Sequence, residues 1–139
     1  RLAQVMRLRE LQTEAGRDGG VLSGHHENWR ETEDPPPWPR NSILLGDFNM
    51  TPDESAYVAL AGPKDPKHGQ ITETDGYIDA WIFSGGDKNA GYTKFEASGN
   101  RRIDYAFVSP NLAAGIKAVW VDAEAQGSDH QPLWIEIDL

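Results

Sequence analysis

The chain contains no cysteine among its 139 residues, which excludes a disulfide framework and a thiolate metal site. Basic residues are also few, because 13 lysines and arginines stand against 22 acids and give a net charge of -9. This acidic balance opposes the phosphate attraction that drives sequence-independent DNA binding. No apolar run approaches the length of a membrane-spanning helix. The length permits one domain with a hydrophobic core, or half of a larger domain.

Hydrophobic periodicity predicts one helix followed by several short strands. An apolar stripe from Arg1 to about Ala15 indicates an amphipathic helix. The predicted strands are 43–46, 92–95, 102–108, 115–121 and 132–137. Residues 77–83 are apolar enough to form either a strand or a short buried helix.

Two other segments are read from their turn residues. Residues from about 17 to 41 are rich in glycine, proline and charge, which predicts a long loop. Both a cleft lining and a surface insertion fit this loop. The run Thr-Pro-Asp-Glu at 51–54 matches a capping box with proline at the first helical position, and predicts a short helix through about Leu60.

Two polar turns, each beside an apolar strand-like run, carry groups suited to phosphoryl chemistry. Asp47 and Asn49 follow the aliphatic run 43–45, and Asp129 and His130 precede the run 132–137. A cation that neutralises phosphate, a carboxylate that positions water, and an imidazole or amide that stabilises phosphate oxygens are what such chemistry needs. The two turns therefore indicate a metal-assisted phosphoester site, although either one alone would also suit an ordinary turn.

A third acid, Asp104, lies inside the strand-like stretch 100–108. A carboxylate among apolar residues is costly to bury without a partner. Arg101 and Arg102 are the neighbours that would form a salt bridge with it. The local sequence alone does not decide which group is the partner of Asp104.

The three motifs together resemble a known family. Gly-Asp-Phe-Asn at 46–49, Arg-Ile-Asp-Tyr-Ala-Phe at 102–107 and Ser-Asp-His-Gln-Pro at 128–132 resemble, in order and spacing, the C-terminal half of the endonuclease/exonuclease/phosphatase superfamily, the fold of deoxyribonuclease I. The resemblance covers nearly the whole chain. It implies a layered α/β sandwich in which residues 1–139 form about one sheet plus flanking helices, with the long loop at about 17–41.

The resemblance also implies roles for five residues. Asp47 positions or activates the attacking water, and Asn49 hydrogen-bonds the phosphate. Asp129, together with Asp47, belongs to the site of Mg²⁺ or Mn²⁺. His130 contacts the phosphate, and Asp104 orients the His130 imidazole and keeps it protonated.

Two further positions lie in stretches that the family shares. Asp79, in Gly-Tyr-Ile-Asp-Ala-Trp at 76–81, corresponds to a residue that supports the fold and not the chemistry. Thr93 resembles a position that lies at the substrate cleft in some members.

The first half of the family domain has no counterpart in the chain. That half carries an asparagine on its first strand and a glutamate that is the principal metal ligand, and nothing here matches them. The sequence therefore predicts a metal-dependent phosphoric ester hydrolase, acting by in-line attack of water, that is inactive as the isolated chain. The alternative is a non-catalytic remnant that acts as a binding or interaction module.

The expected partners follow from the same half-domain interpretation. A sheet without its packing partner exposes apolar surface, so self-association or pairing with a missing N-terminal half is expected. The face that includes part of Leu133, Ile135 and Ile137 is the predicted contact. The substrate is a phosphoester of unspecified class, with nucleic acid disfavoured by the acidic charge.

Overall fold

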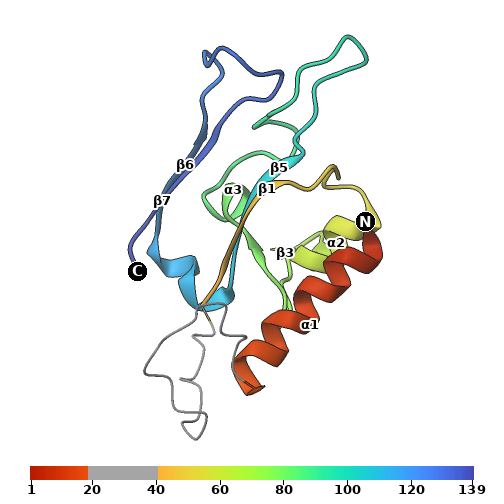
Figure 1. The fold of residues 1–139 in the computed structure, drawn as a ribbon, viewed down its shortest axis with the longest axis vertical. Helices are drawn as coiled ribbons and strands as arrows, with labels where there is room; N and C mark the ends of the chain where they lie inside the picture. The colour runs from red at the N-terminus through yellow and green to blue at the C-terminus, as the bar shows by residue number, and fades with distance from the viewer. Residues whose placement is uncertain (19–40) are drawn as a thin grey trace, which may run out of the picture.

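The computed structural model describes residues 1–18 and 41–139, and the predicted loop at about 17–41 lies almost wholly outside the described residues. The helices are α1 (Leu2–Asp18), α2 (Ser55–Ala61), α3 (Ala80–Phe83) and the 3₁₀ helix η1 (Pro110–Gly115). The strands are β1 (Ile43–Asp47), β2 (Lys64–Asp65), β3 (Gly69–Gln70), β4 (Ile78–Asp79), β5 (Asp104–Val108), β6 (Ile116–Val121) and β7 (Leu133–Ile137). Figure 1 shows their arrangement in space.

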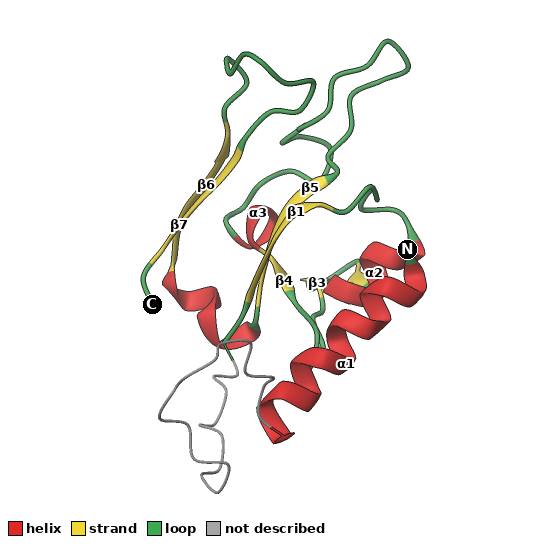
Figure 2. Cartoon of the chain, viewed as in Figure 1, coloured by secondary structure: helices red, strands yellow, loops and turns green. Residues whose placement is uncertain are grey.

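The described strands form a central antiparallel sheet of order β1-β5-β4 and two separate antiparallel pairs, β2-β3 and β6-β7. Helices α1 and α2 lie on one side of the central sheet, and the β6–β7 hairpin lies on the other (Figure 2). The described chain is therefore layered, with a helical layer, a sheet and a hairpin.

Two hydrophobic clusters lie between these layers. The pairing of β1 with β5 decides which residues belong to each cluster. Tyr105 and Phe107 point toward the helices and pack in the first cluster with Val5 of α1 and four buried residues of α2. Alternate residues point to the opposite face of a strand. Val108, paired with Ile43, accordingly belongs to a second cluster beneath the hairpin.

Most of the predicted elements are confirmed, with differences at three places. The segment 92–95 is not a regular strand, since only Lys94 forms isolated bridges, to Arg101 and to His130. The apolar stretch 77–83 contains both β4 and α3. The open choice between strand and helix there is resolved by Asp79, whose carboxylate accepts a hydrogen bond from the Trp81 amide and caps α3.

Helix α2 begins at Ser55 and not at Pro52 as the capping-box pattern predicted. Glu54 is the N-cap residue and makes no side-chain cap bond. Its carboxylate instead accepts a hydrogen bond from the Thr51 amide at 3.0 Å. The Thr-Pro-Asp-Glu run therefore forms a turn before the helix.

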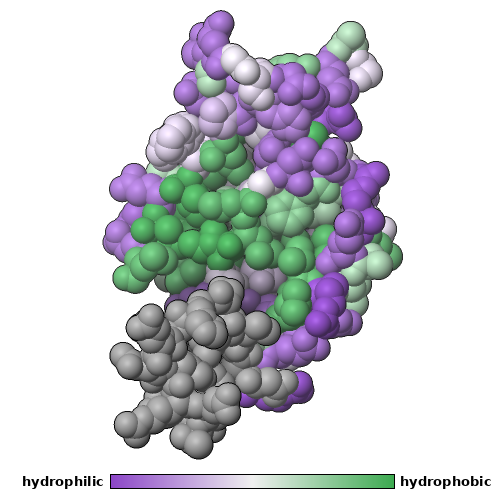
Figure 3. Space-filling model, viewed as in Figure 1, coloured by the Kyte–Doolittle hydropathy of each residue, from purple (hydrophilic) through white to green (hydrophobic). Residues whose placement is uncertain are grey.

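The apolar surface near the hairpin includes residues beyond the predicted contact. Ile135 and Ile137 are partly buried and pack against the second cluster of the chain itself. The large apolar side chains left open near the hairpin are Leu45, Trp120 and Trp134, which are 63%, 44% and 51% exposed. The two indole rings stack with centroids 6.1 Å apart. Figure 3 shows a broad hydrophobic area on the face of the chain that is turned toward the viewer. Among the described residues no helix is long and apolar enough to cross a membrane.

Candidate functional site

The turn after β1 holds Asp47 and Asn49 in one hydrogen-bonded unit. Asp47 Oδ1 accepts from the Asn49 amide at 2.8 Å, and Asp47 Oδ2 accepts from Asn49 Nδ2 at 2.9 Å. Asn49 has a positive φ of 51°, a conformation that asparagine adopts more readily than most residues. The Tyr105 hydroxyl lies 2.9 Å from the Met50 carbonyl and 2.8 Å from the Arg102 carbonyl, which joins this turn to the start of β5.

The partner of Asp104 is His130. His130 Nδ1 lies 2.9 Å from Asp104 Oδ2, and the two side chains are 27% and 18% exposed. Neither arginine that the sequence offered pairs with Asp104, because Arg101 pairs with Glu96 and Arg102 with Asp79. A carboxylate acceptor at Nδ1 assigns the hydrogen to that nitrogen, so Nε2 is the ring atom left for a ligand.

Asp47 and Asp104 are register partners on adjacent strands, and His130 joins them. One ligand atom from each of the three side chains lies within 4.8 Å of the others. We call this group the Asp47–Asp104–His130 cluster. Like charges directly opposite each other destabilise a sheet, so two carboxylates here favour a bound cation. Carboxylate oxygens are donors that Mg²⁺ and Mn²⁺ prefer.

A hollow of about 490 Å³ adjoins this cluster. Its lining includes the polar residues Asp104 and His130 and the apolar residues Leu45 and Trp134. Polar groups thus line a hollow with apolar walls between the central sheet and the hairpin, an arrangement typical of small-molecule sites.

Asp129 lies beside the cluster but outside it. Its side chain is 78% exposed and forms an ion pair with the ammonium of Lys94, which is 14% exposed. The hydrogen bond from Lys94 lowers the pKa of Asp129 below its ordinary value. The metal-binding role of Asp129 stays a prediction. Sequence reasoning missed Lys94, since a lysine in a strand-like run carries no signal of a partner 35 residues away.

Thr93 does not line a cleft, contrary to the expectation from the resemblance. Its relative exposure is 0%. The hydroxyl oxygen accepts from the backbone amides of Ile103 and Asp104 at 3.3 and 3.1 Å. Thr93 therefore lies in the interior, behind the site, and not at the surface.

A buried polar network supports the strand that carries Asp104. Arg102 Nη1 lies 2.6 Å from Asp79 Oδ2, with both side chains at most 2% exposed, and the Tyr57 hydroxyl donates to the same oxygen at 2.7 Å. The guanidinium lies 4.7 Å from the centroid of the Tyr105 ring. Burial raises the pKa of both Tyr57 and Tyr105. Asp79 therefore serves the fold, as the resemblance implied.

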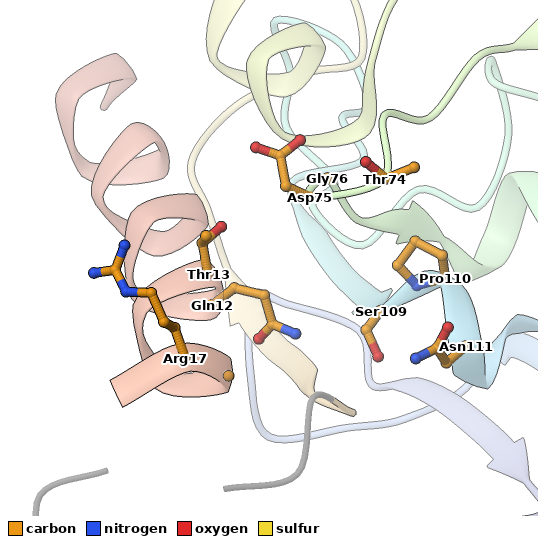
Figure 4. A pocket seen from close by; sticks show the side chains of 10 residues that line it. Gln12, Thr13, Arg17, Thr74, Asp75, Gly76, Ser109, Pro110 and Asn111 are labelled. Carbon is orange, nitrogen blue, oxygen red and sulfur yellow. The ribbon is translucent and has the colours of Figure 1, made fainter. Parts of the chain in front are cut away.

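A second hollow, of about 510 Å³, lies between α1 and the start of η1 (Figure 4). Thr13, Asp75 and Asn111 are among its lining residues. None of the three cluster residues lines it, so we place the site at the cluster and not in this hollow.

The chain is similar to known proteins over most of its length. The model of the family described as "Endonuclease/Exonuclease/phosphatase family" matches residues 15–130. No curated protein matches the chain. A similar solved structure is the 3′ phosphatase NExo from Neisseria, bound to a product DNA hairpin, with 26% identity and a TM-score of 0.54. The match covers 99% of this chain and 51% of that protein, so the chain spans about half its length.

Proposed function

Because the chain belongs to the endonuclease/exonuclease/phosphatase family, we propose that it supplies one half of a metal-dependent phosphoester hydrolase site. The residues of this half are Asp47, Asn49, Asp104, Asp129 and His130. The observation that carries the proposal is the convergence of Asp47, Asp104 and His130 within 4.8 Å at the edge of a hollow. A purely structural pairing of two acids across a sheet would oppose folding.

Asp47 would position the attacking water and accept its proton. Its carboxylate is exposed at the end of β1, and both of its oxygens are oriented by Asn49. Held in this way, the carboxylate does not need to reorganise when water approaches phosphorus in line. The Asn49 side-chain amide has a second N–H that would donate to a phosphate oxygen.

His130 would stabilise the charge that develops on the phosphate. Its Nδ1 is committed to Asp104, which fixes the orientation of the ring. As the imidazolium that the family resemblance implies, the ring would donate its Nε2–H to a non-bridging oxygen. A preorganised donor of this type is typically worth a hundred-fold to a thousand-fold in rate, or about 3–4 kcal/mol.

Asp47 and Asp129 would hold the Mg²⁺ or Mn²⁺ ion. Both are exposed carboxylates, which suit hard divalent cations. When bound, such an ion neutralises the phosphate charge and lowers the pKa of water. Because Lys94 pairs with Asp129, the Asp129 carboxylate would have to leave this ammonium in order to hold the ion.

The site would be complete only with a second half. The chain spans 51% of the similar phosphatase, and Leu45 and Trp134 beside the site remain exposed. We expect the isolated chain to be inactive and to associate with itself or with the complementary half. The substrate is a phosphoester. The DNA product of the similar phosphatase makes a 3′-phosphorylated DNA the first nucleic acid to test, although a net charge of -9 opposes DNA binding.

The test is hydrolysis by a longer protein that contains this chain and its complementary half. A phosphomonoester, a phosphodiester and a 3′-phosphorylated DNA hairpin are offered with and without Mg²⁺. Loss of metal-dependent turnover in Asp47→Asn, with turnover retained in Asp138→Asn, would support the proposal. Asp138 is a matched control because it is an exposed acid paired with Lys117, away from the cluster. Turnover that survives Asp47→Asn would overturn the proposal.

A further inference from the structure

The Asp104–His130 pair is built from two segments 26 residues apart in the sequence. Asp104 opens β5, and His130 lies in the turn before β7. No ladder between β5 and β7 sets their separation, since the sheet orders place the two strands in different sheets. The segment that contacts both of them, which carries Thr93 and the isolated bridges of Lys94 to Arg101 and His130, therefore helps to maintain the distance of 2.9 Å between Nδ1 and Oδ2.

Thr93 contacts both segments. Its carbonyl accepts a hydrogen bond from the Gln131 amide at 2.7 Å, directly after His130. Its hydroxyl oxygen accepts from the amides of Ile103 and Asp104 at 3.3 and 3.1 Å. Its own amide donates to the Arg101 carbonyl at 3.0 Å. Thr93 thus joins the turn that carries the imidazole to the strand that carries the carboxylate.

A substitution at position 93 can remove the side-chain hydroxyl but not the backbone groups. Any residue would supply the backbone carbonyl that holds the His130 turn. Only threonine or serine offers a hydroxyl acceptor at this depth, and Thr93 is completely buried, so water has no access to replace it. Without that oxygen, the two amides at the start of β5 lose their partner and the strand shifts or frays.

From these contacts we propose that Thr93 is a positioning residue that sets Asp104 and His130 at hydrogen-bond distance. The proposal deepens the phosphoesterase function and takes its catalytic meaning from it. The distance between Asp104 and His130 that Thr93 is proposed to set can be tested without an assay of turnover. Thr93 acts on the phosphate only through His130, and it touches no reacting atom.

The experiment follows the imidazole N–H of His130 by NMR in the ¹⁵N-labelled chain. In the unaltered chain we expect an Nδ1–H signal protected from exchange by Asp104. Thr93→Val keeps the shape and removes the hydroxyl, and we expect that N–H to exchange with water about tenfold faster, the size expected for loss of one hydrogen bond. The Asp104 amide should exchange faster to a similar extent. Thr93→Ser should restore the slow exchange of both N–H groups.

A control variant separates positioning from general loss of stability. Val108→Ala opens a cavity at the far end of β5, where Val108 is fully buried and packs beneath the hairpin. It should leave the His130 N–H protected. If Thr93→Val does not fold, Thr93→Cys keeps a similar volume with a weak sulfur acceptor and is measured in its place.

Two results would overturn the proposal. One is a folded Thr93→Val or Thr93→Cys variant with the His130 N–H as protected as in the unaltered chain. The other is an equal loss of protection in Val108→Ala. Neither result would bear on phosphoester hydrolysis, which the metal-dependent assay with Asp47→Asn tests separately.

Discussion

Asp47 and Asp104 lie directly opposite each other on adjacent antiparallel strands, with His130 completing a cluster whose ligand atoms lie within 4.8 Å. Two carboxylates in this register repel each other, and the sheet tolerates them because Asn49 and His130 each bond one of them. The arrangement has a cost to stability that a phosphate-processing site would explain.

Asp47→Asn is expected to raise the stability of the isolated chain while removing the proposed base. The substitution relieves the repulsion with Asp104, and the gain should be up to about 1 kcal/mol in the free energy of unfolding. Urea unfolding of the chain measures it. Asp138→Asn, an exposed acid far from Asp104 along the chain, should not reproduce the gain. A variant less stable than the unaltered chain would contradict the account.

Asp104→Asn and His130→Ala are expected to be non-additive in an active protein that contains the complementary half. Each should lower turnover about a hundred-fold to a thousand-fold under saturating Mg²⁺. The double variant should be little worse than His130→Ala alone, because Asp104 acts through the imidazole. Turnover of the four proteins in the cycle is the measurement. Fully additive losses would show that Asp104 has a separate role.

Arg102→Met is expected to destabilise the chain by about 3–5 kcal/mol, because it leaves Asp79 buried without its cation. Adding Asp79→Leu should recover part of the loss, since the unpaired charge is then removed. Denaturant unfolding of the single and double variants measures both effects. Arg7→Met, which removes a surface ion pair with Glu10, should change stability little.

Stability is expected to fall above about pH 10, where tyrosines of the unfolded chain ionise. Burial raises the folded pKa of Tyr57 and Tyr105, so their neutral forms stabilise the fold below the unfolded pKa. This contribution is lost as the pH rises, because the unfolded state then releases protons that the folded state keeps. Urea unfolding at pH 9 and pH 11 measures the drop, and Tyr57→Phe should reduce it.

The isolated chain is expected to self-associate through the apolar surface near the hairpin. Leu45 and Trp134 are 63% and 51% exposed and lie beside the same hollow. Trp134→Glu should shift sedimentation of the chain toward the monomer. Val58→Glu, which changes an apolar residue 39% exposed on α2, is the matched control and should not. A chain that is monomeric at high concentration would contradict this expectation.

Local sequence determined the elements whose signals are short-range. The stripe of α1, the aliphatic run of β1 and the apolar runs of β5, β6 and β7 each contain their own periodicity, because the pattern of burial repeats within one element. The three motifs identified the family for the same reason, since each is a contiguous segment. Asp47, Asn49, Asp129 and His130 were therefore accessible as candidates without coordinates.

Only the tertiary structure decided which groups meet. The structure places His130, the partner that the resemblance implied, beside Asp104 and not Arg101 or Arg102. It also buries Thr93 between two distant segments and brings Lys94 to Asp129. It also left Trp120 and Trp134 exposed, while Ile135 and Ile137 are partly buried against the second cluster. Each of these outcomes depends on contacts between residues far apart in the chain. The periodicity of one element does not encode such contacts, because the register and packing of separate strands set the distances between these residues.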